Sequence, residues 1–293
     1  MQFRHALAGL LIGCGAIPAS AQDAQSLIAK NLEARGGAAA IDAIKTITFH
    51  GRTILPGDFE LSLKSTQARL GGTDAMRLDL GVQGLDFVQS FDGHGAWKIN
   101  PFQGRKDPER MSADEARQLA DQALIEGPLL ASRTDGSKVQ YLGRDDFDGT
   151  LAYKLKVTQK DGDEFTYWLD PDTLLEIKVE ETRRIRGAQQ INETELGDYE
   201  KVAGVYYPMS IESWAQGQPN QRQRTVIASG TANAPVSPDF FAEPNGPATP
   251  AKASGSPPDA SNKPKGKPAP KPGGAKPTDQ TTPPSSPPKP KGK

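Results

Sequence analysis

Residues 27–51, LIAKNLEARGGAAAIDAIKTITFHG, decide the fold, because the spacing of their apolar residues changes twice. The apolar residues of 24–32 recur at helical intervals and predict a helix with one apolar face. Gly36 and Gly37 end this helix, since glycine readily takes the left-handed conformation of a helix C-terminus. A second short apolar face over 40–44 follows, and the period then falls to two, which predicts the first strand.

Alternation of apolar and polar residues continues to about residue 228, and it is strongest over 151–157. It predicts about ten strands in sequential antiparallel order, joined by turns such as Asp161-Gly162. One stretch interrupts them: Ser112 to Glu115 is a capping box, apolar residues at helical spacing follow, and Gly127-Pro128 ends the helix. The predicted fold is therefore α+β and mainly β. We expect a curved antiparallel sheet or incomplete β-barrel, with the N-terminal and internal helices covering its concave face.

The N-terminal residues predict export. Arg4 precedes an apolar run over 6–17, which is shorter than the roughly 20 residues of a spanning helix, and the small residues Ala19-Ser20-Ala21 follow. We expect a signal peptide over 1–21 and a soluble periplasmic protein. Leu11-Ile12-Gly13-Cys14 also resembles a lipobox, so acylation of Cys14 and lipid anchoring in the bacterial envelope stay open as the alternative.

The C-terminal residues differ in composition. Residues 244–293 hold 15 of the 25 prolines and nine lysines against two aspartates, and they lack aromatic, Leu, Ile, Val and Met residues. Such a segment buries too little apolar surface to offset its ordering entropy, which predicts a disordered tail with a charge of +7. Residues 22–243, with a charge of −9, are then one folded domain.

No residue pattern predicts catalysis. The sequence contains no nucleophile elbow, phosphate-binding loop or dinucleotide fingerprint, and only His50 and His94 are available as histidine ligands beyond the signal. Adjacent carboxylates such as Glu180 and Glu181 point to opposite faces of a strand and do not converge. We therefore expect no enzyme, metal, cofactor or nucleic-acid partner, and a monomer.

Three arginines near one strand end, Arg183, Arg184 and Arg186, allow two interpretations. Their guanidinium groups could contact an anionic head group. They could equally be a solvated strand edge that discourages pairing with another chain, which is the interpretation that we favour.

Four segments carry a family resemblance: LIAKNLEARGG at 27–37, IDAIKTI at 41–47, WLDPDTLLEIKVE at 168–180 and GVYYPMSIESW at 204–214. Over about residues 24–241 the chain resembles the LolA-like family of periplasmic lipoprotein carriers and outer-membrane lipoprotein-sorting proteins. The resemblance implies a LolA/LolB-like incomplete barrel in which helices form a lid over a hydrophobic cavity.

The resemblance further implies a ligand, namely an acylated lipoprotein or lipid whose buried methylenes each contribute about 0.8 kcal/mol. The expected cavity-lining residues are apolar residues of the first helix and of the alternating strand faces: Leu27, Ile28, Leu78, Leu80, Phe87, Tyr153, Leu155, Tyr167 and Ile177. The same residues could instead fill a closed core. In that case the protein would be an envelope interaction or sensor module, whose basic tail contacts anionic cell-wall or membrane surfaces.

Overall fold

A computed structural model describes residues 19–104, 106–185 and 187–244 of the chain. Residues 1–18, which include Cys14, lie outside the described residues, as do Arg186 and residues 245–293. The signal peptide, the lipidation alternative and the tail therefore stay predictions. In the described part, none of the helices has the length and apolar character needed to cross a membrane.

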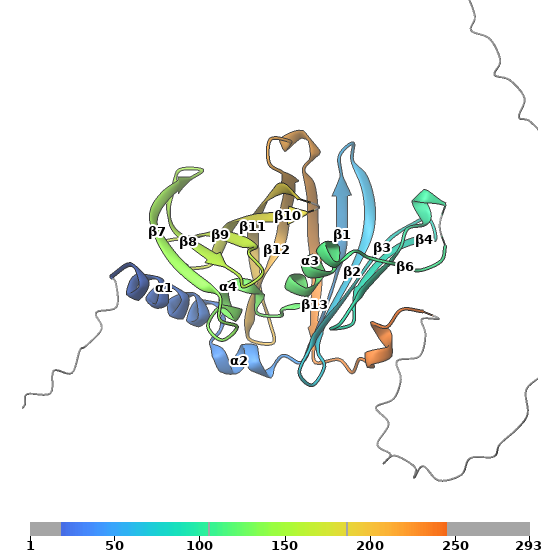
Figure 1. Ribbon diagram of the computed structural model, residues 1–293, viewed down its shortest axis with the longest axis horizontal. Helices are drawn as coiled ribbons and strands as arrows, with labels where there is room; N and C mark the ends of the chain where they lie inside the picture. Colours follow the sequence, from blue (N-terminus) through green and yellow to red (C-terminus); the bar gives the residue numbers. More distant parts are fainter. Residues whose placement is uncertain (1–18, 105, 186, 245–293) are drawn as a thin grey trace, which may run out of the picture. The chain divides into compact units, whose positions relative to one another are not determined.

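The described residues form thirteen strands and four α-helices (Figure 1). The helices are α1 (Ala19–Arg35), α2 (Ala38–Ala43), α3 (Ala113–Ala123) and α4 (Gly127–Ala131). The strands of the first half are β1 (Thr46–Leu55), β2 (Phe59–Arg69), β3 (Asp74–Val82), β4 (Leu85–Phe91), β5 (Ala96–Ile99) and β6 (Glu109–Arg110). Those of the second half are β7 (Lys138–Phe147), β8 (Thr150–Thr158), β9 (Glu164–Leu169), β10 (Glu176–Ile185), β11 (Ala188–Val202), β12 (Val205–Ala215) and β13 (Gln223–Ala232).

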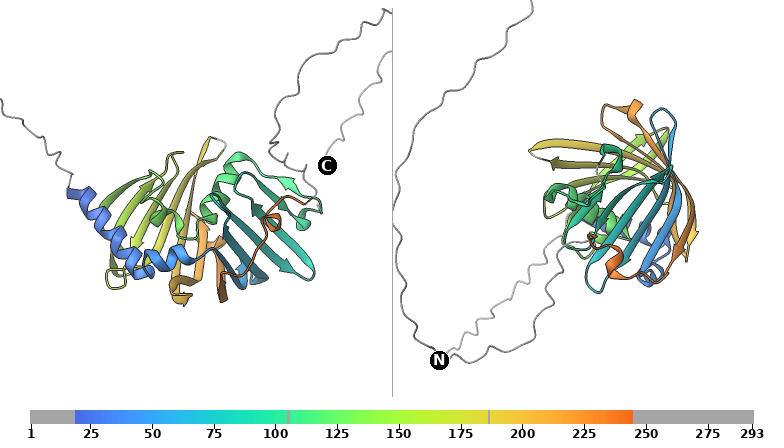
Figure 2. Two further views of the ribbon diagram at one scale, coloured as in Figure 1. Left: turned by 90° about the horizontal axis from the view of Figure 1, so that it is seen from below. Right: turned by 90° about the vertical axis from the view of Figure 1, so that its right-hand side faces the viewer.

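All thirteen strands belong to one antiparallel sheet in the order β6-β5-β4-β3-β2-β1-β13-β12-β11-β10-β9-β8-β7. Strands that are consecutive in the chain pair with each other, except β6 and β7, and β13 returns to pair with β1 in the middle of the sheet. The sheet curves strongly but does not close, since β6 and β7 are its two edges (Figures 1 and 2). This confirms the predicted curved, mainly β fold, with three strands more than expected. One of them, β6, has only two residues and no periodicity that a sequence could reveal.

The strand order explains the position of α3 and α4. Because β6 and β7 are consecutive in the chain but lie at opposite edges, residues 111–137 must cross the whole sheet. They cross its concave side, where α3 and α4 lie (Figure 2). We call residues 112–131 the roof segment.

The N-terminal helices run along one rim of the sheet (Figure 2). Leu27 and Ile28 of α1 pack in the main core with Leu155 of β8 and Tyr167 of β9. The helix ends at Arg35, as predicted, because Gly36 follows with a φ of 128°. A side chain at Gly36 would also collide with the carbonyl oxygen of Gly204, so glycine permits the close approach of α1 to the β11–β12 turn.

The internal helix begins as the sequence predicts. The Ser112 hydroxyl accepts a hydrogen bond from the Glu115 amide at 3.3 Å, and the Glu115 carboxylate accepts one from the Ser112 amide at 2.9 Å. The prediction that Gly127-Pro128 ends the helix was wrong. Helix α3 already ends at Ala123, and Gly127 and Pro128 begin α4. A proline is tolerated in the first turn of a helix because its missing N–H has no helical partner there.

Candidate ligand cavity

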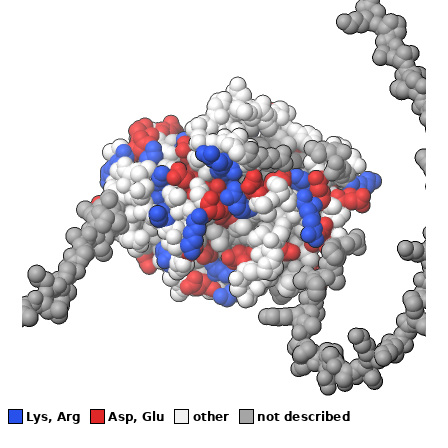
Figure 3. Space-filling model, viewed as in Figure 1, with Lys and Arg blue, Asp and Glu red and all other residues white. Residues whose placement is uncertain are grey.

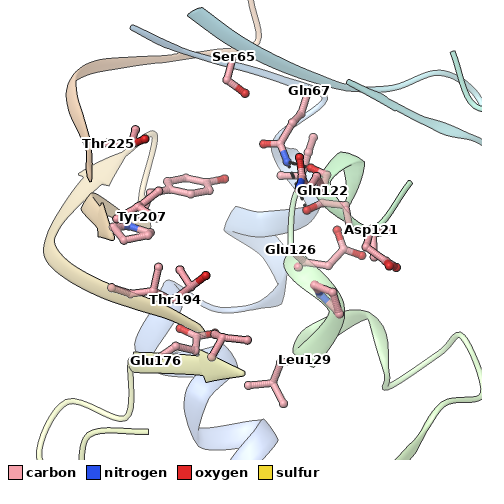
Figure 4. A pocket seen from close by; sticks show the side chains of 18 of the residues that line it. Ser65, Gln67, Asp121, Gln122, Glu126, Leu129, Glu176, Thr194, Tyr207 and Thr225 are labelled. Atoms are coloured by element: carbon pink, nitrogen blue, oxygen red, sulfur yellow. Dashed lines mark hydrogen bonds between the residues drawn. The ribbon is translucent and has the colours of Figure 1, made fainter. Parts of the chain in front are cut away.

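A partly open cavity of about 540 Å³ lies between the concave face of the sheet and the roof segment (Figure 4). Its size falls within the usual range of small-molecule sites, about 300–1,000 Å³. Aliphatic and aromatic side chains from both halves of the sheet and from the roof segment line most of it: Phe49, Leu63, Met76, Leu78, Leu124, Ile125, Leu129, Phe165, Val179, Leu196, Ile211 and Ile227. Such a lining is suited to an apolar ligand.

On the β2 side, two polar side chains hold the roof segment. Gln67 donates a hydrogen bond to the Gln122 carbonyl at 2.5 Å, and Arg69 forms an ion pair with Glu126. Arg69 also donates to the carbonyls of Ile41 and Ile44, at 2.9 and 3.0 Å, so it joins the roof segment to the end of α2. These contacts attach the roof segment to the sheet through side chains, with the cavity beneath.

On the other side, the roof segment is held through Arg183. This guanidinium is 3 % exposed and pairs with Asp121 of α3 at 2.6 Å, with Asp163 at 2.5 Å and with Glu181. Gln159 donates a further hydrogen bond to Asp121 at 2.7 Å. Desolvation by burial raises the pKa of Asp163, although the nearby Arg183 charge opposes this shift.

A buried polar group forms part of the cavity wall next to α1. Arg35 pairs with Glu176 at 3.3 Å and donates to the Tyr206 carbonyl at 2.9 Å. Tyr199 donates to the Glu176 carbonyl at 2.7 Å. Both Arg35 and Glu176 are less than one-tenth exposed, so their charges depend on each other for compensation.

Tyr207 of β12 points from the sheet into the cavity (Figure 4). Its ring contacts Phe49 edge-on, with centroids 5.2 Å apart, and the Arg35 guanidinium lies 5.5 Å from its centroid. Among the described residues, none is a hydrogen-bond partner of its hydroxyl. Desolvation raises the pKa of Tyr207, so the hydroxyl is neutral and can donate a hydrogen bond at neutral pH.

The predicted cavity residues separate into several groups. Leu78 and Tyr167 line the cavity, while Leu27, Ile28 and Leu155 are buried in the main core beside it. Leu80 and Phe87 are paired with each other on the same concave face as Leu78, but they lie beyond the cavity. Tyr153 packs against the main core on the same face as Leu155. Ligand contact by these residues stays a prediction.

Ile177 is not on the cavity side. The pairing of β10 with β9 shifts between Glu176 and Lys178, which is a β-bulge, so Glu176 and Val179 both line the cavity. Ile177 instead lines a separate depression with Phe147 and Asp170. The sequence alternation predicted the wrong face because a bulge inserts one residue and reverses the pleat.

Two members of the predicted arginine cluster, Arg183 and Arg184, are described, while Arg186 lies outside the described residues. Arg183 is buried on the concave side, whereas its neighbour Arg184 is exposed. Strand β10 lies between β9 and β11, but its pairing with β9 ends at Thr182, so residues 183–185 pair with β11 alone. The edge interpretation of Arg184 and Arg186 therefore stays a prediction. Arg183 already carries three carboxylate partners and is not free to contact an anionic head group.

Sequence reasoning missed Arg35, Glu176 and Tyr207 as cavity residues. Tyr207 alternates with Val205 and Met209, so it is indistinguishable from a core residue in the sequence. A signal for Arg35 was available, because a cation in the last turn of a mostly apolar helix face requires a nearby partner or solvent. Its partner Glu176 is 141 residues away and could not be paired with it from spacing alone.

Charged side chains of both signs lie beside one another on the face that Figure 3 shows. Within the described ranges, His, Cys, Asp and Glu residues form no group of three or more that could hold a metal ion. The cavity is therefore the feature of the described residues that best supports a binding function.

The comparisons with known proteins show the fold. The chain is similar to a DUF1329 family protein from Desulfovibrio piger, with a TM-score of 0.54 and 11 % identity over 76 % of this chain and 97 % of that one. It is similar to a putative outer membrane lipoprotein-sorting protein domain from Vibrio parahaemolyticus, with a TM-score of 0.52 and 14 % identity over 74 % of this chain and 97 % of that one.

A LolA superfamily protein from Nitrosomonas europaea is also similar, with a TM-score of 0.50 and 16 % identity over 75 % of this chain and 97 % of that one. No protein-family model matches the sequence, and no curated protein does. The class that these likenesses define is the LolA-like fold, an unclosed antiparallel sheet with helices over its concave side. This confirms the fold that the sequence resemblance predicted.

Proposed function

We propose that this protein is a periplasmic, non-enzymatic binder or carrier of lipoproteins or other acylated ligands, and that the cavity beneath the roof segment holds the acyl chain. The observation that carries the proposal is the cavity itself. It has about 540 Å³ of space and a largely apolar lining. Each methylene that leaves water for such a lining contributes about 0.8 kcal/mol, so an acyl chain needs no covalent attachment to be held.

The fold supports the same function. Its neighbours include a protein described as a putative outer membrane lipoprotein-sorting domain. Side-chain contacts attach the roof segment to both sides of the sheet, at Gln67 and at Arg183. Such contacts can break and re-form without unfolding the sheet, which gives an acyl chain a route in and out.

The experiment is native mass spectrometry of protein purified from its own envelope. We expect adducts with the masses of lipids or acylated peptides, which a fatty-acyl competitor displaces. A clean apo mass, together with no binding of any acyl probe to the purified protein, would overturn the proposal.

A pair of variants on β2 locates the binding. Ser65 lines the cavity (Figure 4). Ser62 is exposed, and it lies on the opposite face of the same strand because it is an odd number of residues away. Ser65→Trp places an indole in the cavity and should abolish the adducts, while Ser62→Trp should leave them. Equal adducts in both variants would exclude this cavity as the binding site.

A further inference from the structure

Among the described residues that line the cavity, one side chain has a buried polar atom without a protein partner, the hydroxyl of Tyr207. The residue is 5 % exposed, and the hydroxyl has no hydrogen-bond partner among the described residues. Leaving a buried hydroxyl unpaired costs free energy, so it marks a place where a bound molecule can supply the missing hydrogen bond. The ring is fixed by Phe49 and by the Arg35 guanidinium, so the hydroxyl is held in position before a ligand arrives.

The charges around the cavity limit which ligand fits. Counted over the described residues, its lining has four carboxylates, Asp121, Glu126, Glu176 and Glu181, and two guanidinium groups. Both guanidinium groups are already engaged: Arg35 pairs with Glu176, and Arg183 pairs with three carboxylates. Glu126 is likewise paired, with Arg69 of β2.

An anionic head group would therefore lose its hydration without gaining a free counter-ion, because each of these cations is already engaged by a carboxylate. The site is partly shielded from water, where leaving a charge without a partner costs more than in bulk solvent. An uncharged polar group meets no such penalty, and a carbonyl oxygen can accept the hydrogen bond that the neutral Tyr207 hydroxyl offers.

We propose that the cavity is selective for neutral acyl esters, with the Tyr207 hydroxyl donating a hydrogen bond to an oxygen of the ester, and that it discriminates against ionised fatty acids. This inference rests on the proposed function, since it names the ligand class of the same cavity. Tyr207 is then a specificity-determining residue, while the apolar lining supplies most of the affinity.

The test compares three ligands with the same lauroyl or dodecyl chain at neutral pH. Monolauroylglycerol, laurate and dodecyltrimethylammonium each compete with a neutral fluorescent probe, N-phenylnaphthylamine, for the full-length protein. We expect the ester to displace the probe at a concentration about tenfold or more below that of laurate, the difference that about 1.4 kcal/mol produces.

Two tyrosine variants separate the hydroxyl from the rest of the site. Tyr207→Phe should weaken binding of the ester by about 3- to 10-fold, the effect of one hydrogen bond, and leave laurate unchanged. Tyr206→Phe is the matched control. Tyr206 directly precedes Tyr207 on β12, so its side chain points to the opposite face of the sheet, where Lys201 lies over its ring. It should bind the ester as the parent protein does. Tyr207→Phe removes only an unpartnered hydroxyl, so its melting temperature should not fall.

The outcomes are distinguishable. If the probe does not bind and none of the three ligands does, the proposed function fails and this inference fails with it. If the probe binds but laurate competes as well as the ester, or Tyr207→Phe binds the ester normally, the inference is overturned while the function stands. Tighter binding of dodecyltrimethylammonium than of the ester would also overturn it, in favour of a site for cations.

Discussion

Arg183 is buried in strand β10 with carboxylates around it from α3, from the loop before β9 and from its own strand. Its exposed neighbour Arg184 has the same side chain in the opposite environment. A buried ion pair adds little net stability, because desolvation offsets most of the attraction, yet removing one partner leaves the other charge uncompensated. The importance of Arg183 is therefore structural.

The difference between an intact buried ion pair and one that has lost a partner predicts the effect of two substitutions. Arg183→Met should lower the free energy of unfolding by about 3–5 kcal/mol, because it leaves buried carboxylates without their counter-ion. Asp163→Asn should cost much less, since burial already raises the pKa of Asp163 and so disfavours its charged form. Urea unfolding measures both. Equal losses for the two variants would contradict the prediction.

At the scale of elements, the roof segment depends on contacts at its start as well as over the cavity. Glu115 completes the capping box of α3 and pairs with Lys98 of β5 at 2.9 Å. The hydrogen bond from Lys98, followed by that from the Ser112 amide, lowers the pKa of Glu115 to about 2. Its ordinary value is 4.5, so the charged form is stabilised by folding.

The sign of this shift predicts a pH dependence. The stabilisation from Glu115 is complete above pH 4.5 and is lost as the pH falls toward about 2. Glu115→Gln should therefore lower the melting temperature at pH 7, by the equivalent of about 0.5–1 kcal/mol for this partly exposed pair. The difference from the parent protein should shrink between pH 4.5 and 2.

Glu33→Gln is the control, because Glu33 is an exposed carboxylate on α1. It should leave the melting temperature nearly unchanged over the same pH range. A constant difference between the parent protein and Glu115→Gln at every pH would show that the charge of Glu115 does not act on stability.

At the scale of the whole molecule, the C-terminal residues of the domain close a separate small core. Phe241 is fully buried against Ala68 and Ala75. Its carbonyl accepts hydrogen bonds from the Trp97 indole at 2.8 Å and from the Ser90 hydroxyl at 2.9 Å. The folded unit thus depends on residues that immediately precede the proline-rich segment.

Two truncations test where the domain ends. A chain ending at residue 247, the limit of the first compact unit, should melt at the same temperature as the full chain. A chain ending at residue 236 loses Phe241 and should lose about 3 kcal/mol or more, which corresponds to about 6–12 °C for a domain of this size. Differential scanning calorimetry measures both. If the chain that ends at residue 247 melts at a lower temperature than the full chain, part of the domain lies beyond residue 247.

Much of the architecture was predictable because it depends on local sequence. Helix α1, its end at Gly36 and the capping box at Ser112 each follow from residues within a few positions of one another. Apolar alternation located most strands for the same reason. Ile177 was placed on the wrong face because alternation gives no sign of the bulge that reverses the pleat at Glu176.

The sequence by itself determined the class of fold, an antiparallel curved sheet with helices over one side. Only the tertiary structure decided which side chains form the cavity. Arg35 and Glu176 are 141 residues apart, and Tyr207 resembles an ordinary core residue until the roof segment is placed opposite it. The physical reason is that periodicity reports which face of a strand is apolar. Whether that face meets a packed neighbour or an open space depends on elements that the chain brings together only on folding.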